Sequence, residues 1–224
     1  MNPPEQEGVI KFELQFEQKP LPEALDLSQL IAWRAVFHRL RLIGQDPGRY
    51  GGLGFGNISQ KFPAHPADST DALVISGTQT GAGEILRRAD FCQISGFSIE
   101  HNRICAEGPV KPSSEALTHA AVYHADASIA FVIHAHCPEI WRATRALAIP
   151  AIPDSIAYGT PKMAAAVGVL IGASQQRSCG LFSMLGHEDG VISYGKCADE
   201  AATRLVTTLA RAIALHGTKA ADRI

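Results

Sequence analysis

The sequence predicts an α/β fold, and three observations support this prediction. Short apolar segments typical of buried strands recur along the 224 residues, and longer segments with helical periodicity separate them. The chain also opens on an alternating segment typical of a strand with one solvated face. This irregular mixture favours a sandwich of three α/β/α layers over a strict alternation of strand and helix. A single domain over 1–224 is expected, with loose ends at about 1–8 and 217–224.

The first quarter of the chain predicts one strand, one helix and a glycine-rich loop. Residues 9–17 alternate apolar and polar side chains, as in a half-buried strand. Residues 23–43 carry an apolar stripe at helical spacing, and Gly44 is expected to end this helix in a left-handed conformation. The loop at 44–57 lacks the GxGxxG spacing and follows a helix rather than a strand, which excludes the dinucleotide-binding fingerprint.

The remainder of the chain predicts four strands and four helices. The apolar segments typical of buried strands lie at 72–76, 129–133, 180–185 and 190–194. The helical patterns lie at about 113–126, 138–147, 160–172 and 197–216. Residues suited to helix ends support these bounds: Ser113, Pro138, Thr160, Pro161 and Gly217.

Composition excludes several classes of function. Hydrophobic residues make up 46% and charged residues 19% of the chain, with a net charge of −2, so neither disorder nor nucleic-acid binding is expected. The five cysteines are scattered without a CxxC pair, which is typical of free thiols in the cytoplasm. The N-terminus lacks the pattern of a secretory leader, and no apolar run is long enough for a membrane span.

A His-x-His motif ends one of the predicted buried strands. Strand alternation places the imidazoles of His134 and His136 on one face, and Pro138 then starts a helix, which leaves the pair at the edge of the sheet. Two such imidazoles can bind a zinc ion through nitrogen. Ordinary core or surface histidines fit the same pattern, so the motif by itself leaves both interpretations open.

Two further segments have the same two interpretations. Ser113, Ser114 and Glu115 open a predicted helix, and they suit either an ordinary helix start or a phosphate site with a proton-accepting carboxylate beside it. His119 follows Glu115 by four residues, so it orients that carboxylate, offers a metal ligand or forms a pair with Glu115 on the helix surface. His187 lies in a predicted turn between two buried strands, where a polar residue is common.

Four motifs occur in a characteristic order: Gly56-Asn57-Ile58-Ser59, Pro112-Ser113-Ser114-Glu115, His134-Ala135-His136, and His187 followed by Gly190-Val191-Ile192. Together they resemble the class II aldolase/adducin family, of the fuculose-phosphate aldolase and ribulose-phosphate 4-epimerase type, over about 25–215. The resemblance implies a mostly antiparallel central sheet within the sandwich. It also implies a bound divalent ion, Zn²⁺ or another such as Mn²⁺, Co²⁺ or Fe²⁺, and a homotetramer with the site at a subunit boundary.

The resemblance also assigns roles to individual residues. It implies His134, His136 and His187 as metal ligands. It implies Glu115 as the catalytic carboxylate, with Tyr158 as the only tyrosine of the loop after His-x-His that is suited to catalysis. The positions that match phosphate-binding donors of the family are Asn57, Thr78, Ser113 and Ser114.

Three departures from the family pattern bear on these roles. The family aldolases also use a tyrosine from the C-terminal tail, whereas this sequence has no tyrosine after Tyr194. Glu188 and Asp189 separate His187 from Gly190, whereas the family usually has His directly before Gly, so a carboxylate is an alternative third ligand. Gln79 follows Thr78 where the aldolases usually have glycine, and its bulk leaves open whether the substrate is phosphorylated.

The implied function is that of a metal-dependent lyase. It would cleave or form a C–C bond through a metal-stabilised enediolate on a small sugar-like carbonyl substrate. An epimerase, a dehydratase or a decarboxylase would share this intermediate, and a non-catalytic adducin-like binding module is a further alternative. The presence of Glu115 together with His134 and His136 favours an enzyme, because a binding module has no need of all three.

Overall fold

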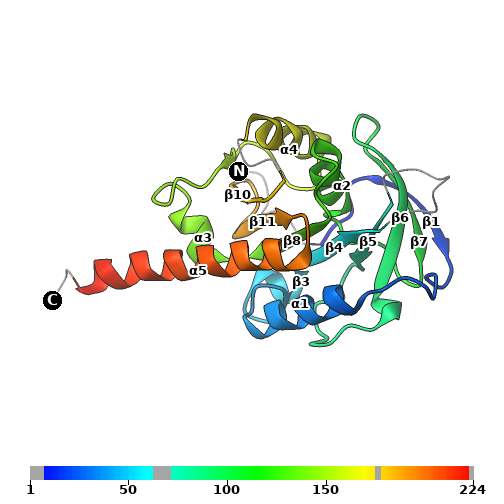
Figure 1. Ribbon diagram of the computed structural model, residues 1–224, viewed down its shortest axis with the longest axis horizontal. Helices are drawn as coiled ribbons and strands as arrows, with labels where there is room; N and C mark the ends of the chain where they lie inside the picture. Colours follow the sequence, from blue (N-terminus) through cyan, green and yellow to red (C-terminus); the bar gives the residue numbers. More distant parts are fainter. Residues whose placement is uncertain (1–7, 63–71, 175–177, 222–224) are drawn as a thin grey trace.

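The computed structural model describes residues 8–62, 72–174 and 178–221. Its main sheet contains β1 (Glu13–Gln18), β4 (Asn57–Lys61), β5 (Leu73–Ser76), β6 (Phe91–Ser98), β7 (Arg103–Gly108), β8 (Phe131–His136), β9 (Ala151–Ile152), β10 (Gly180–Met184) and β11 (Gly190–Gly195). The strand order is β1-β7-β6-β5-β4-β8-β11-β10-β9, and β2 (Gly44–Gln45) pairs separately with β3 (Gly54–Phe55) (Figure 1). Within the described residues, only β1 with β7 and β9 with β10 are parallel pairs of the main sheet, so the expected mostly antiparallel sheet is confirmed.

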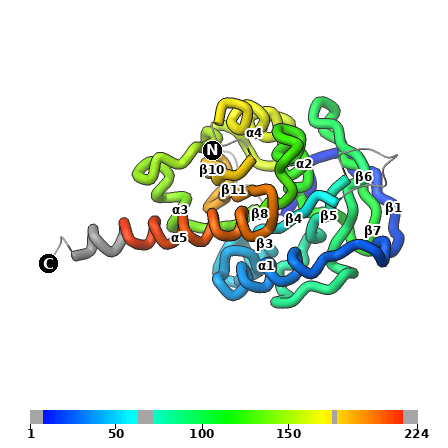
Figure 2. Tube along the Cα trace, in the orientation of Figure 1, coloured from blue at the N-terminus to red at the C-terminus, as the bar shows by residue number. Residues whose placement is uncertain are grey.

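Helices cover both faces of this sheet (Figure 2). The helices α1 (Ser28–Arg39), α3 (Pro138–Ala143) and α5 (Ala198–Ala221) pack on one face, whereas α2 (Ala116–Ala125) and α4 (Pro161–Ala173) pack on the other. Neighbouring strand residues contribute to opposite layers: Val132 lies in the core under α2 and α4, and Ile133 in the core under α1, α3 and α5. The predicted three-layer sandwich is therefore confirmed.

Most strand predictions agree with the structure, although some bounds differ. The strand expected at 129–133 starts at Phe131 and continues through His136. The first strand begins later than predicted, at Glu13, but its alternation holds, since Leu14 and Phe16 pack against the core. The sequence prediction missed β4, β6 and β7, and it also missed the two-residue strands β2, β3 and β9. In β6 a register shift between Ile94 and Gly96 interrupts the period of two on which strand prediction relies.

The first helix is shorter than predicted, and Gly44 does not end it. The helix ends at Arg39, and Arg41 takes the left-handed conformation with φ of 59°. The amide of Leu42 donates to the carbonyl of Phe37 at 2.9 Å, which is the bond pattern of a Schellman motif. Gly44 instead lies in β2, because the chain has already turned before reaching it.

The predicted ends of the other helices are partly confirmed. Thr160 is the N-cap of α4 and accepts a hydrogen bond from the amide of Met163 at 3.2 Å, while Pro138 and Pro161 occupy first turns. The second helix starts at Ala116 rather than 113, so Ser113 is not its cap. The last helix continues to Ala221, past Gly217. Residues 1–7 and 222–224 of the predicted loose ends lie outside the described residues.

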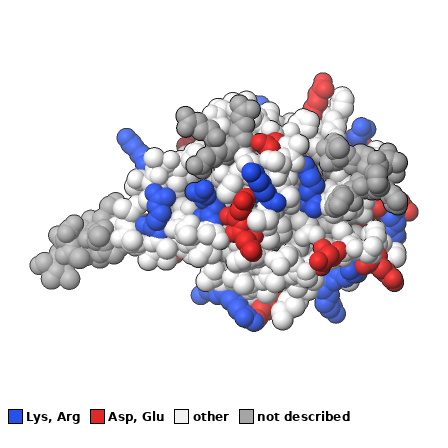
Figure 3. All heavy atoms as spheres, viewed as in Figure 1, with Lys and Arg blue, Asp and Glu red and all other residues white. Residues whose placement is uncertain are grey.

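The surface charges and the cysteine thiols do not distinguish between the candidate functions. Acidic and basic side chains are intermixed on the face shown in Figure 3, as expected for a net charge of −2. All five cysteines are free thiols. Within the described part of the chain, no helix combines the length and the apolar character needed to cross a membrane.

Candidate metal centre

The centre of the sheet carries the His-x-His motif. Every residue of β8 is buried, because β4 and β11 pair with it on either side and helices cover both faces. The register places Asn57 of β4 opposite His134, and Gly190 of β11 opposite His136. Alternation along β8 puts the two imidazoles on the same face, with ring centroids 5.0 Å apart. The shared face agrees with the sequence prediction, whereas the expected place at the edge of the sheet is wrong, because strands pair with β8 on both sides.

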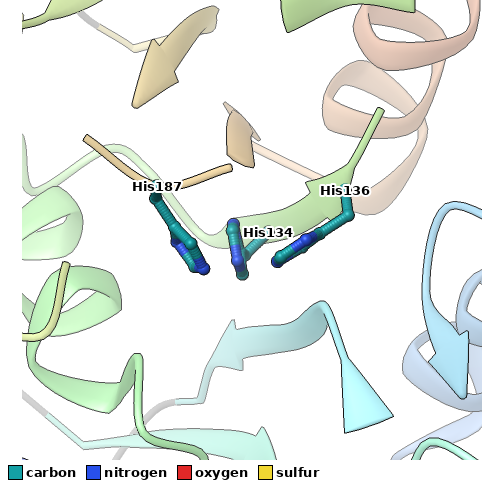
Figure 4. Close-up of side chains that lie close together, drawn as sticks. All are labelled: His134, His136 and His187. Atoms are coloured by element: carbon teal, nitrogen blue, oxygen red, sulfur yellow. The ribbon is translucent and has the colours of Figure 1, made fainter. Parts of the chain in front are cut away.

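The third histidine comes from the turn between β10 and β11. The amide of His187 donates to the carbonyl of Met184, and its carbonyl accepts from the amide of Gly190, so the turn is tight. Gly190 leaves space for the imidazole, because a Cβ there would lie 3.1 Å from the His187 ring. The three side chains point toward one another (Figure 4), and one ligand atom from each lies within 4.8 Å of the others.

The hydrogen bonds of His134 suit it to bind a metal. Its Nδ1 lies 3.2 Å from the carbonyl oxygen of Val191, which can only accept, so Nδ1 carries the proton. The lone pair therefore lies on Nε2, which is buried and has no hydrogen-bond partner. Burial and the neighbouring imidazoles hold the pKa of both His134 and His136 well below the usual value, which keeps them in the neutral form that binds metals. The donor set and its burial fit a divalent cation such as zinc.

A buried carboxylate lies beside these imidazoles. Glu115 is only 1% exposed and immediately precedes α2. One of its carboxylate oxygens, Oε1, is 3.8 Å from Nδ1 of His187. The backbone amide of Glu115 donates to Oγ of Ser113 at 3.3 Å, which helps to orient the start of the helix. The structure thus brings together the three predicted metal ligands and Glu115, which is one of the two residues predicted to have catalytic roles.

The two carboxylates that separate His187 from Gly190 are placed differently. Glu188 is exposed. Asp189 is buried, but its Oδ2 accepts a hydrogen bond from the hydroxyl of Tyr50 at 2.8 Å. Among the described residues, the cluster able to hold an ion consists of the three histidines. The geometry therefore favours His187 over either carboxylate as the third ligand.

Tyr158 supports the third histidine through its ring. The side chain is 1% exposed, and its ring stacks on the imidazole of His187, with centroids 4.3 Å apart and planes 18° apart. The ammonium of Lys11 lies 3.8 Å from the centroid of the Tyr158 ring and donates to the Tyr158 carbonyl at 3.1 Å. Two groups so close to one ring centroid would collide on the same face, so Lys11 and His187 lie on opposite faces.

Two residues near the site were missed or misplaced by sequence reasoning. Tyr50 lies in the glycine-rich loop with φ of 48°, and its ring centroid is 4.5 Å from that of His136. Only the glycine content of the loop indicated that its backbone could approach a site. The interpretation of His119 as part of a helix-surface pair is wrong, because the side chain is fully buried and its Nδ1 lies 2.7 Å from Oγ of Ser59.

The predicted phosphate-binding residues also come together. One pocket is lined by all four residues: Asn57, Thr78, Ser113 and Ser114. Ser114 directly precedes Glu115 in the chain, and Asn57 lies opposite His134 in the sheet. The four residues come from separate segments of the molecule: the start of β4, the loop after β5 and the approach to α2. The pocket is small, with a volume of about 20 Å³.

Comparison with known proteins assigns the family. The model of the class II aldolase and adducin N-terminal domain matches residues 48–214. The chain belongs to this family. A search of curated proteins finds no significant match.

Solved structures of the family share the fold at low identity. YgbL from Escherichia coli, described as a putative aldolase/epimerase/decarboxylase, has a TM-score of 0.62 and 16% identity, over 84% of this chain and 86% of its own. L-fuculose-1-phosphate aldolase from Thermus thermophilus has a TM-score of 0.61 and 16% identity, over 87% and 96%. A sugar-phosphate aldolase from Thermotoga maritima has a TM-score of 0.59 and 15% identity, over 86% and 93%. At this identity the likeness concerns the fold.

Proposed function

We propose that this class II aldolase family member is a divalent-metal-dependent lyase that cleaves or forms a C–C bond in a small sugar-like carbonyl compound. The observation that carries the proposal is the convergence of three buried imidazoles with the carboxylate of Glu115 beside them. Burying these polar groups costs stability unless they bind something, because His134 Nε2 has no partner in the protein. A binding module without a ligand in this position has no reason to retain them.

The roles of the side chains follow from their positions. His134, His136 and His187 would hold the cation, and a divalent cation bound there polarises carbonyl and hydroxyl oxygens of a substrate. Glu115 would accept a proton from the substrate hydroxyl as the neighbouring C–C bond breaks, and would return it when the bond forms. Burial of the site excludes water, which strengthens these electrostatic interactions. We assign Tyr158 as a candidate for a second proton-transfer group, since its ring lies against His187.

Metal analysis of the purified protein tests this proposal. We expect about one equivalent of zinc or another divalent ion per chain after dialysis, and its loss in His134→Ala. The matched control is His124→Ala, because His124 is exposed at the end of α2 and away from the cluster. Full metal content in His134→Ala would contradict the ligand assignment. A folded wild type that binds no metal would favour the binding-module alternative.

The oligomeric state and the cellular location of the protein are also proposals. By family resemblance we propose a homotetramer of cytoplasmic chains that acts on a small molecule. Light scattering coupled to size-exclusion chromatography would test the assembly, and a monomer at micromolar concentration would contradict it.

A further inference from the structure

The pocket lined by the predicted phosphate-binding residues is narrow. The space in it that is open to the centre of a water-sized group is about 20 Å³. A phosphate carries four oxygens around phosphorus, so it is bulkier than the hydroxyl of an unphosphorylated substrate. The donors expected for phosphate thus surround a restricted space.

Gln79 takes part of this space. Its side chain lines the pocket, and its Oε1 accepts a hydrogen bond from the amide of Gly54 at 3.2 Å. Its Nε2 lies against Gly8, where an added Cβ would be only 2.3 Å away. Gly54 and Gly8 also line the pocket, so the carboxamide extends between two segments at its edge. Residue 8 lies outside residues 48–214, so the family match does not cover this contact.

The loop that carries Gln79 is held in place from two sides. Arg34, which is 1% exposed, donates to backbone carbonyls of the following residues, including Thr80 and Gly81 at 3.2 and 3.0 Å. Gly81 packs so tightly that an added Cβ would lie 2.2 Å from the carbonyl oxygen of Gly44. The loop therefore cannot retreat to enlarge the pocket, and only the Gln79 side chain itself can move.

The pocket retains a polar group suited to a small guest. The side-chain oxygen of Asn57 is buried and has no hydrogen-bond partner. An amide oxygen accepts hydrogen bonds, so a hydroxyl that donates a proton satisfies it, whereas a phosphate would bind through the amide nitrogen of the same side chain. A small guest with a hydroxyl therefore satisfies this oxygen and suits the narrow pocket.

We propose that Gln79 is a specificity-determining residue that closes the anion pocket, so the substrate ends in a hydroxyl where phosphorylated substrates would carry phosphate. The substrate class is then a small unphosphorylated hydroxy-aldehyde or hydroxy-ketone. This inference rests on the proposed function for the reaction. The closure of the pocket is a separate property that can be measured without turnover.

Gln79→Gly is the test variant, because residue 79 has a left-handed φ of 56° that glycine adopts without strain. The variant should therefore fold and open the pocket. The matched control is Gln79→Glu, which keeps the size of the side chain and its ability to accept from Gly54. Binding of inorganic phosphate to each metal-stripped protein would be measured by phosphorus NMR and calorimetry, so that phosphate cannot bind through a metal. Metal content would be measured separately on untreated samples.

We expect Gln79→Gly to bind phosphate about tenfold more tightly than the wild type, because displacing Gln79 breaks its hydrogen bond to Gly54. The Gln79→Glu protein should show no gain. Equal phosphate binding by the wild type and Gln79→Gly would overturn the inference, as would a gain of the same size in Gln79→Glu. If phosphate binding changes as expected but untreated wild type holds no metal, the closed pocket stands and the proposed lyase fails. If metal binds but Gln79→Gly gains nothing, only the closed pocket fails.

Discussion

The buried His119 predicts a specific dependence of stability on pH. Its side chain is fully buried on α2, its Nδ1 is hydrogen-bonded to Ser59, and its Nε2 has no partner. Because burial disfavours the charged imidazolium, the pKa of His119 falls from its usual 6.5 to about 3. In the unfolded chain the same group binds a proton near pH 6.5.

The sign and size of the effect follow from this difference. Between pH 6.5 and about 3, the unfolded state carries a proton on His119 that the folded state does not, so the free energy of unfolding falls as the pH falls. The slope from this residue is about 1.4 kcal/mol per pH unit, which amounts to about 2 kcal/mol between pH 6.5 and 5. Above pH 6.5 the contribution of His119 is constant.

Urea unfolding of metal-free protein at pH 7, 6 and 5 measures this slope. His119→Gln keeps a hydrogen-bonding side chain that cannot titrate, so its stability should fall less steeply with pH, by about 2 kcal/mol less over the range. An NMR titration of the native protein gives a second measurement, in which the His119 ring signals should stay constant down to pH 5. Identical slopes for the variant and wild type, together with a His119 ring that titrates near pH 6.5, would refute the reasoning.

Three further predictions concern the site and its supports. Glu115→Gln should retain the metal and lower turnover by about 10²- to 10⁴-fold, and unchanged turnover would remove Glu115 from proton transfer. Lys11→Met should weaken metal binding about tenfold in a chelator competition, because Lys11 lies against the ring of Tyr158, which stacks on His187. Lys11→Arg should keep the metal affinity of the wild type, and equal metal affinities for Lys11→Met and the wild type would contradict this support. Arg34→Met should lower the free energy of unfolding by about 3 kcal/mol, because the buried guanidinium bonds to backbone carbonyls of the loop after Gln79. Arg39→Met, on the exposed side of α1, should lower it by under about 1 kcal/mol. Equal losses for the two variants in urea unfolding would contradict the structural role of Arg34.

The structure explains which sequence predictions held. The strand containing Val132 and Ile133 was predictable because an uninterrupted apolar run marks a strand buried on both faces. The end of α1 was not, since glycine is the usual left-handed residue and Arg41 takes that role instead. The strand β6 was missed because its register shift breaks the alternation. The extent of a single domain over 1–224 stays a prediction.

Some residues of the candidate site could likewise be placed from the sequence, and others could not. The sequence by itself determined that His134 and His136 share a face, because strand alternation is a local property of consecutive residues. Only the tertiary structure brought His187 to the pair, buried His119 and extended Gln79 across the edge of the anion pocket. These contacts join residues far apart in the chain, and they depend on the order of strands in the sheet and on the paths of the turns between them. Local periodicity carries no information on that order, because it records only which face of its own element a residue occupies.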